Sequence, residues 1–192
     1  MTIARAAQNA GVAMVTVHGR TREQGYKGLA EYDTIAEVKA ALIIPVVANG
    51  DITSGEKARD VLAYTGADAV MLGRVAQGRP WIFREVVHFL ATGTQLAPPL
   101  VMDVKRLLID HLQDHYALYG EFTGVRSARK HIGWYVRALP DGEAFRAQMN
   151  ALVDAQAQLD AVSDFFDGLS DVTDRMPAVD MVDNKNEEEV CV

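Results

Sequence analysis

Three short apolar runs each end in small and polar residues whose types suit the binding of a phosphate group. These endings are His18-Gly19-Arg20, Asn49-Gly50-Asp51 and Gly73-Arg74. A glycine lets a phosphate approach the backbone closely, and an arginine pairs with it by charge and bidentate hydrogen bonds. The imidazole of His18 and the amide of Asn49 can hydrogen-bond a planar polar ring. Together these residues predict a cofactor-phosphate site.

Each ending also has a simpler explanation. Gly-Arg after a strand is commonly a turn, Asn-Gly-Asp is a common turn sequence, and a lone histidine there is often structural. Asp51 can simply cap the helix that follows it. Three consecutive runs with the same kind of ending nevertheless favour a binding site over three unrelated turns.

The apolar runs alternate with amphipathic stretches, which is the pattern of βα units and a parallel sheet. Strands are predicted at 13–17, 44–48 and 69–72. Four helices are predicted around these strands. The first ends near Asn9, and the second begins at Asp33 as its N-cap. The third begins with a capping box formed by Thr53 and Glu56, and the fourth runs from Pro80 to about Ala91. Ligands of parallel βα proteins bind at the carboxyl ends of the strands, where the polar endings lie.

In the rest of the chain, the sequence pattern predicts helices and no further strand. Residues 92–100 contain two prolines and a glycine and are the predicted linker. Helices are expected at 101–119, 124–138 and 143–167, so residues 101–168 form a helical domain after a βα domain at 1–91. Residues 169–192 are acidic and poor in large apolar groups, which predicts a disordered tail.

Composition places the chain among soluble globular proteins, with 49% hydrophobic and 23% charged residues. The net charge of −7 is unevenly distributed, because residues 151–192 carry 11 acidic and 2 basic residues. Whole-chain acidity therefore does not exclude a nucleic-acid partner. No apolar run approaches the roughly 18 residues of a membrane span, and a cytoplasmic protein without membrane contact is expected. With Cys191 as the single cysteine, neither an internal disulfide nor a metal site is expected.

The predicted helix at 124–138 combines an apolar stripe with a basic face. The apolar stripe comprises Val125, Ala128, Ile132, Val136 and Leu139. The basic candidates are Arg126, Arg129, Lys130 and Arg137. Phosphate contacts from such a face would give salt-sensitive RNA binding, with Trp134 or Tyr135 available for base stacking if exposed. A solvated helix face without a ligand is the alternative.

Four segments together resemble the tRNA-dihydrouridine synthases, most closely the bacterial B subgroup. They are Val17 to Arg22, Pro45 to Ile52, Thr65 to Arg74 and Gly78 to Phe83, and the similarity continues through Arg129 to Tyr135, covering roughly residues 1–168. The resemblance implies the last three strands of a TIM (βα)₈ barrel followed by a helical domain that holds tRNA. It implies FMN as cofactor, bound by His18, Asn49, Gly50, Asp51, Gly73 and Arg74.

In this family NADPH reduces FMN, and the flavin passes a hydride to the uracil ring of tRNA. The resemblance places the catalytic cysteine and a flavin-contacting lysine upstream of Met1, so we assign no catalytic residue. We expect that this chain alone does not reduce uridine, and that its three open strands favour association or dependence on the other barrel half. Two alternatives stay open, namely another FMN- or phosphate-binding TIM-barrel enzyme and a non-catalytic RNA-binding module.

Overall fold

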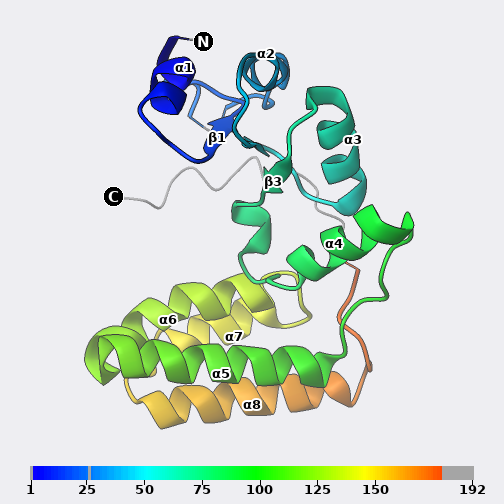
Figure 1. Cartoon of the computed structure of the whole chain (residues 1–192). Helices are drawn as coiled ribbons and strands as arrows, with labels where there is room; N and C mark the ends of the chain where they lie inside the picture. Colours follow the sequence, from blue (N-terminus) through cyan, green and yellow to red (C-terminus); the bar gives the residue numbers. More distant parts are fainter. Residues whose placement is uncertain (1, 26, 179–192) are drawn as a thin grey trace. The chain divides into compact units, whose positions relative to one another are not determined.

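The chain forms two compact units, Met1–Leu96 and Ala97–Val192, in a computed structural model that describes residues 2–25 and 27–178 (Figure 1). The division falls inside segment 92–100, where the two prolines lie. The first unit contains a parallel sheet with helices, and the described part of the second unit is mainly helical. Each unit is described by itself below.

The sheet of the first unit has three parallel strands, β1 (Val15–His18), β2 (Val46–Asn49) and β3 (Ala69–Met71), in the order β1-β2-β3. All three predicted strands are confirmed, with ends that differ by one or two residues. The register pairs His18 with Asn49 and Asn49 with Met71. Because the strands are parallel, their polar endings meet at one edge of the sheet.

Helices cover one face of this sheet. They are α1 (Thr2–Asn9), α2 (Asp33–Ala41), α3 (Gly55–Thr65) and α4 (Ile82–Thr92), with a short 3₁₀ helix η1 (Arg74–Ala76) after β3. Val15, Val17 and Val70 pack against a buried cluster that includes Ile35 and Ile82. Successive side chains of a strand point to opposite faces. Accordingly, the alternate residues Thr16, His18, Ala69 and Met71 are exposed.

Two predicted helix caps are wrong. The N-cap of α3 is Ser54, whose hydroxyl accepts a hydrogen bond from the Lys57 N–H at 3.2 Å, so Thr53 does not form the capping box. The cap position of α2 is Tyr32, whose side chain makes no capping hydrogen bond, and the Asp33 carboxylate instead accepts a hydrogen bond from the Tyr64 hydroxyl. A shift of one residue at a helix start is enough to change which side chain reaches the free N–H groups.

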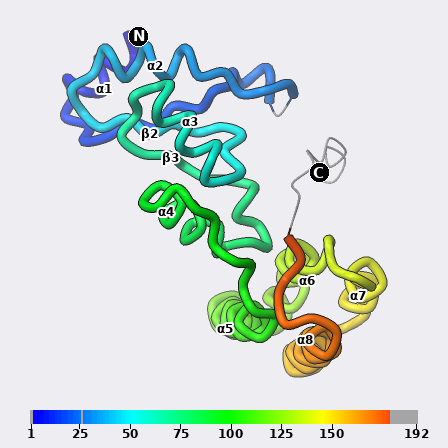
Figure 2. The backbone as a smooth tube through the Cα atoms, turned by 90° about the vertical axis from the view of Figure 1, so that its right-hand side faces the viewer, coloured from blue at the N-terminus to red at the C-terminus, as the bar shows by residue number. Residues whose placement is uncertain are grey.

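The second unit contains α5 (Val101–Tyr119), α6 (Glu121–Val136), α7 (Gly142–Met149) and α8 (Ala155–Ser170). Helix α5 packs against both α6 and α8, and Figure 2 shows α5 and α8 side by side, nearly end-on. The predicted apolar stripe is confirmed, because all five of its residues are buried. The single helix predicted at 143–167 is wrong. Asp154 starts a new helix there by accepting a hydrogen bond from the Ala157 N–H at 2.7 Å.

The chain beyond α8 returns to the start of α5. The Val101 N–H donates to the Asp174 carbonyl at 3.0 Å, the Met176 N–H donates to the Pro99 carbonyl at 3.0 Å, and Met176 is buried. Packed structure thus extends into the segment 169–192 that the sequence predicts to be disordered. The remainder, including Cys191, lies outside the described residues. Among the described helices, none combines the length and the apolar character that crossing a membrane requires.

Candidate phosphate-binding rim at the strand ends

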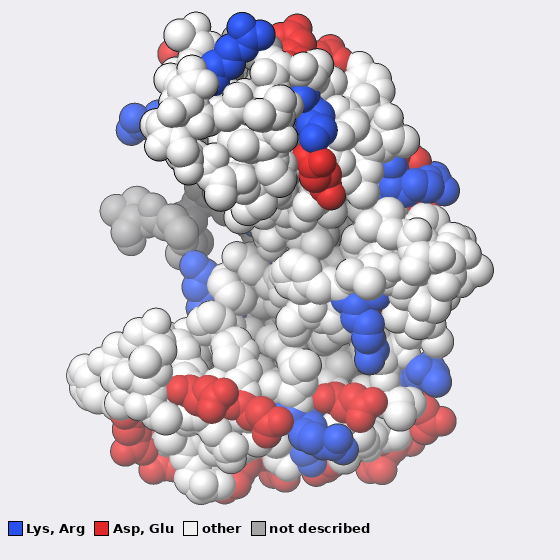
Figure 3. All heavy atoms as spheres, viewed as in Figure 1, with Lys and Arg blue, Asp and Glu red and all other residues white. Residues whose placement is uncertain are grey.

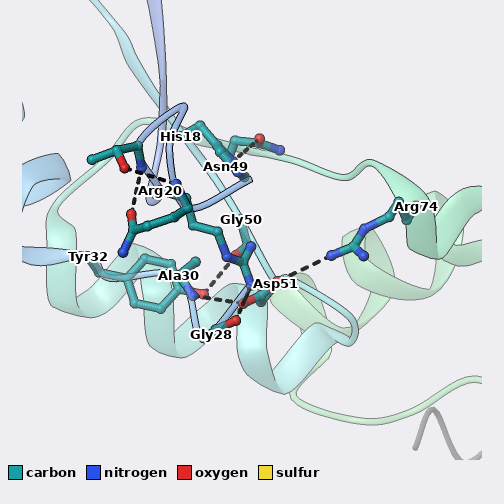
Figure 4. Close-up of polar contacts among 11 residues, drawn as sticks. His18, Arg20, Gly28, Ala30, Tyr32, Asn49, Gly50, Asp51 and Arg74 are labelled. Carbon is teal, nitrogen blue, oxygen red and sulfur yellow. Dashed lines mark hydrogen bonds and ion pairs between the residues drawn. The ribbon is translucent and has the colours of Figure 1, made fainter. Parts of the chain in front are cut away.

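The structure brings the predicted site residues of the first unit together at one edge of the sheet. We call this set the strand-end rim, and Figure 4 shows most of it. The rim comprises His18, Asn49, Gly50, Asp51, Gly73 and Arg74. Its members follow β1, β2 and β3 in turn, so the parallel register alone places them side by side.

A chain of hydrogen bonds orients the two ring-binding candidates of the rim. The Asn49 amide nitrogen donates to the Met71 carbonyl at 2.8 Å, which turns its amide oxygen toward His18. This oxygen lies 2.7 Å from His18 Nδ1. Since the oxygen can only accept, Nδ1 is the donor in this contact, which leaves Nε2 for a ligand.

Asp51 is the centre of the rim's charged contacts. Its Oδ2 accepts hydrogen bonds from Arg20 Nη2 at 2.6 Å and from the Ala30 N–H at 2.8 Å. Its Oδ1 lies 3.7 Å from Arg74 Nη2, so two guanidinium groups approach this carboxylate from opposite sides (Figure 4). Partial burial raises the pKa of Asp51, but the Ala30 N–H and the two arginines outweigh it and hold that pKa below its usual value. Asp51 is therefore ionised at neutral pH.

Arg20 belongs to the first of the three predicted endings, although the resemblance did not place it among the FMN-binding residues. Its side chain is only 3% exposed, and it also donates to the Gly28 carbonyl at 2.7 Å. Its contact with Asp51 holds the loop between β1 and α2 against the end of β2. The sequence contained a signal, because Arg20 and Asp51 each stand two residues after the paired residues His18 and Asn49.

The two rim glycines have different environments. Gly50 has a φ of +127°, and a Cβ there would lie 2.7 Å from the Cβ of Ala30. Its small size is therefore required by packing against the loop, and its carbonyl accepts a hydrogen bond from the Tyr32 hydroxyl at 2.8 Å. A Cβ at Gly73 would meet none of the described atoms within 4 Å. Gly73 thus borders open space beside Arg74, whose side chain is 57% exposed.

The basic candidates of α6 differ in what their side chains contact. Arg126 is exposed and its guanidinium lies 3.6 Å from the ring centre of Phe122. Lys130 is also exposed, with Nζ 5.3 Å from the ring centre of Trp134. The Arg129 guanidinium instead donates a hydrogen bond of 2.8 Å to the carbonyl of Leu152, which lies in the segment between α7 and α8.

Arg137 is partly buried, and Tyr135 is buried, so Tyr135 is not available for stacking. Large side chains near the turn between α5 and α6 are exposed instead, namely Leu118, Tyr119 and Phe122. The sequence analysis missed this group. Helix α8 carries Asp160, Asp164 and Asp167, and Figure 3 shows acidic side chains gathered along the lower edge of the helical unit, over α8.

A parallel βα sheet with a polar rim at its strand ends, joined to a helical unit, defines a βα protein with a candidate phosphate site. Comparison with known families narrows this class. The chain matches the family model for dihydrouridine synthase (Dus) over residues 1–170, and it belongs to this family.

Two similar curated proteins carry the same functional name. The chain is 58% identical over 168 residues to tRNA-dihydrouridine synthase B of Xanthomonas axonopodis pv. citri, an alignment that covers 88% of this chain and 51% of the relative. It is 54% identical over 166 residues to tRNA-dihydrouridine synthase B of Pseudomonas putida, covering 86% of this chain and 49% of that protein. The chain spans about half the length of the curated relatives it matches.

Proposed function

We propose that this chain is the C-terminal portion of a flavin-dependent tRNA-dihydrouridine synthase, in which its sheet is the last three strands of a TIM barrel. The main support for this proposal is the strand-end rim, which brings the candidate cofactor residues together in a chain that belongs to this family. The exposed sheet face with Thr16, His18 and Met71 supports the proposal, because side chains on one face of barrel strands point into the barrel.

The rim fits a phosphorylated flavin. Gly73 borders open space beside the exposed guanidinium of Arg74, which suits a phosphate. His18 Nε2 and the Asn49 amide offer hydrogen bonds to a polar ring. FMN bound at this rim and reduced by NADPH would supply the hydride for the reduction of a tRNA uridine to 5,6-dihydrouridine, and a proton donor outside the assigned residues would complete it.

Asp51 has a different role from the other rim residues. A carboxylate that stays ionised repels a phosphate, so Asp51 does not contact the phosphate directly. It holds Arg20 and Arg74 in position, and with them the loop between β1 and α2. Gly50 also acts through packing, because its missing side chain makes room for Ala30.

Flavin titrations test the cofactor assignment. We expect the chain to quench the fluorescence of FMN more strongly, and at lower concentration, than that of riboflavin, which lacks the phosphate. Arg74→Ala should weaken FMN binding by about 10- to 100-fold, the loss of one charge-assisted hydrogen-bonding group, and leave riboflavin unaffected. Arg59→Ala is the matched control, because Arg59 is 58% exposed and lies on α3.

Equal affinity for FMN and riboflavin would contradict the phosphate assignment. So would an Arg74→Ala variant that binds FMN as well as Arg59→Ala does. If tRNA binds while neither flavin does, the observations favour an RNA-binding module without a cofactor, the second candidate function.

The helical unit is the proposed tRNA-binding part. Arg126 and Lys130 are exposed on α6, and Phe122 offers a ring beside Arg126 for stacking. The acidic side chains on α8 disfavour approach of RNA to that helix. We expect the Arg126→Glu/Lys130→Glu variant to lose at least about tenfold in tRNA affinity and to show a shallower dependence on salt.

Arg106→Glu provides the control for charge alone, because Arg106 is 74% exposed on α5 and pairs only loosely with Asp103, at 4.0 Å. The measurement is a filter-binding or anisotropy titration with tRNA at several salt concentrations. Equal affinities of the α6 and α5 variants at low salt would refute the assignment of this surface.

A further inference from the structure

Three histidines of the helical unit converge where α5 and α6 pack together. His111 and His115 lie one turn apart on α5, so they share a face of that helix, and His131 comes from α6. A ring nitrogen of each lies within 4.8 Å of the other two. The sequence-based expectation of no metal site rests on the cysteine count. That count gives no information about a cluster of histidines.

The three rings are inclined to one another rather than stacked. His131 makes an angle of 76° with His111 and 60° with His115, at centroid distances of 5.0 and 5.1 Å. His111 and His115 are nearly perpendicular, at 86°. In this arrangement one ring nitrogen of each histidine lies close to those of the other two.

Some ring nitrogens of this cluster lack hydrogen-bond partners among the described residues. Within the part of the chain that the structure describes, neither His111 nor His131 has a hydrogen-bond partner, although both are partly buried. Partly buried polar rings normally have such a partner. His115 is held by the Ser127 hydroxyl, which lies 2.7 Å from its Nε2. A ligand at its Nδ1 would leave this contact intact, and the contact would fix the orientation of the ring.

Two of the three rings have a lowered pKa. Partial burial, followed by the neighbouring His111, lowers the pKa of His115. Partial burial also lowers the pKa of His131, together with His111, His115 and Lys130. Both shifts favour the neutral form of His115 and His131.

We propose that His111, His115 and His131 bind one Zn²⁺ ion, with the fourth tetrahedral position open to water. Imidazole nitrogen is a preferred ligand of Zn²⁺, and bonds of about 2.0–2.1 Å imply nitrogen separations of about 3.4 Å in a tetrahedral site. The rings therefore need to close by at most about 1.4 Å, which rotation about the broad terminal torsion of histidine allows. The ion would cross-link α5 to α6.

Titration of the full chain with Co²⁺, a coloured substitute for Zn²⁺, tests this site. The protein should carry no affinity tag and should contain Cys191→Ser, so that only imidazole ligands are observed. We expect one Co²⁺ per chain with the intense visible absorption of tetrahedral coordination, and its displacement by Zn²⁺. Zn²⁺ should also raise the melting temperature of the helical unit.

Single-ligand variants distinguish the cluster from other histidines. His111→Gln and His131→Gln should each weaken Co²⁺ binding by at least about 100-fold, since loss of a residue that only hydrogen-bonds a metal ligand already costs about 10- to 100-fold. His88→Gln is the control, because His88 is partly buried on α4 in the other unit and is not part of the cluster. Circular dichroism of each variant verifies that the helices are intact.

The proposal is overturned by the absence of saturable binding, or by a weak octahedral spectrum alone. It is equally overturned if folded His111→Gln retains the affinity of His88→Gln. These outcomes are independent of the flavin and tRNA titrations, because the metal site does not rest on the proposed function.

Discussion

Replacing Asp51 by asparagine should destabilise the first unit and not the second. The change keeps the shape of the side chain, and asparagine tolerates the positive φ of +46° at this position. It removes the charge that neutralises Arg20, whose side chain is 3% exposed. Breaking a fully buried ion pair costs about 3–5 kcal/mol, and the 25% exposure of Asp51 reduces this to about 2 kcal/mol. For a unit of this size, that loss lowers the melting temperature by about 8–16 °C.

Tryptophan fluorescence can report on the first unit alone. The chain has two tryptophans, and Trp134→Phe leaves Trp81 as the only one. Urea unfolding in this background should show the loss for Asp51→Asn but less than about 0.5 kcal/mol for Asp60→Asn, whose ion pair with Arg59 is exposed. Equal losses for the two variants would refute the importance of the Arg20–Asp51 contact.

The same contact predicts how stability depends on pH. The pKa of Asp51 is lowered in the folded chain, so its stabilisation is fully present above the unfolded value of about 3.9 and is lost as the pH falls through the folded value. The difference between wild type and Asp51→Asn should thus be constant from about pH 7 to 5 and shrink below about pH 4. A difference that persists unchanged at about pH 3 would contradict the ionic explanation.

Four further substitutions test packing and hydrogen bonding, each by urea unfolding. Gly50→Ala should cost about 2 kcal/mol, through the contact with Ala30 and the positive φ, whereas Gly73→Ala should cost less than about 1 kcal/mol. Tyr116→Phe removes the donor to the buried Gln158 amide oxygen, a bond of 2.6 Å, and should destabilise the second unit by about 1–3 kcal/mol, as read from Trp134. Ile132→Ala should cost about 2–5 kcal/mol in the second unit and leave the Trp81 transition unchanged.

The strands and the rim were predictable because their signals are local. Each strand is a short apolar run, and parallel pairing brings successive strand ends to one edge. The apolar stripe of α6 was equally visible from its spacing. The break between α7 and α8 was not, because polar residues such as Asn150 and Asp154 also suit the solvent face of one long helix.

What the sequence could not predict depends on contacts between distant segments. The role of Asp51 follows from the path of the loop that carries Arg20 and Ala30, which no local pattern specifies. The inward turn of Arg129 depends on where the chain between α7 and α8 passes. The meeting of His131 with His111 likewise depends on the pairing of two helices, and only the i, i+4 spacing on α5 was visible beforehand.

The register of the sheet also disfavours incorrect pairing of its strands. His18, Asn49 and Met71 stand in one row, and a slip of β2 by one residue would turn Asn49 toward the hydrophobic core and Ala48 toward water. The slipped strand would lose the bonds from Asn49 to both neighbours at the same time. The polar residues of the candidate site thereby make an incorrectly paired sheet costly, so selection for ligand binding and selection for correct strand pairing act on the same side chains.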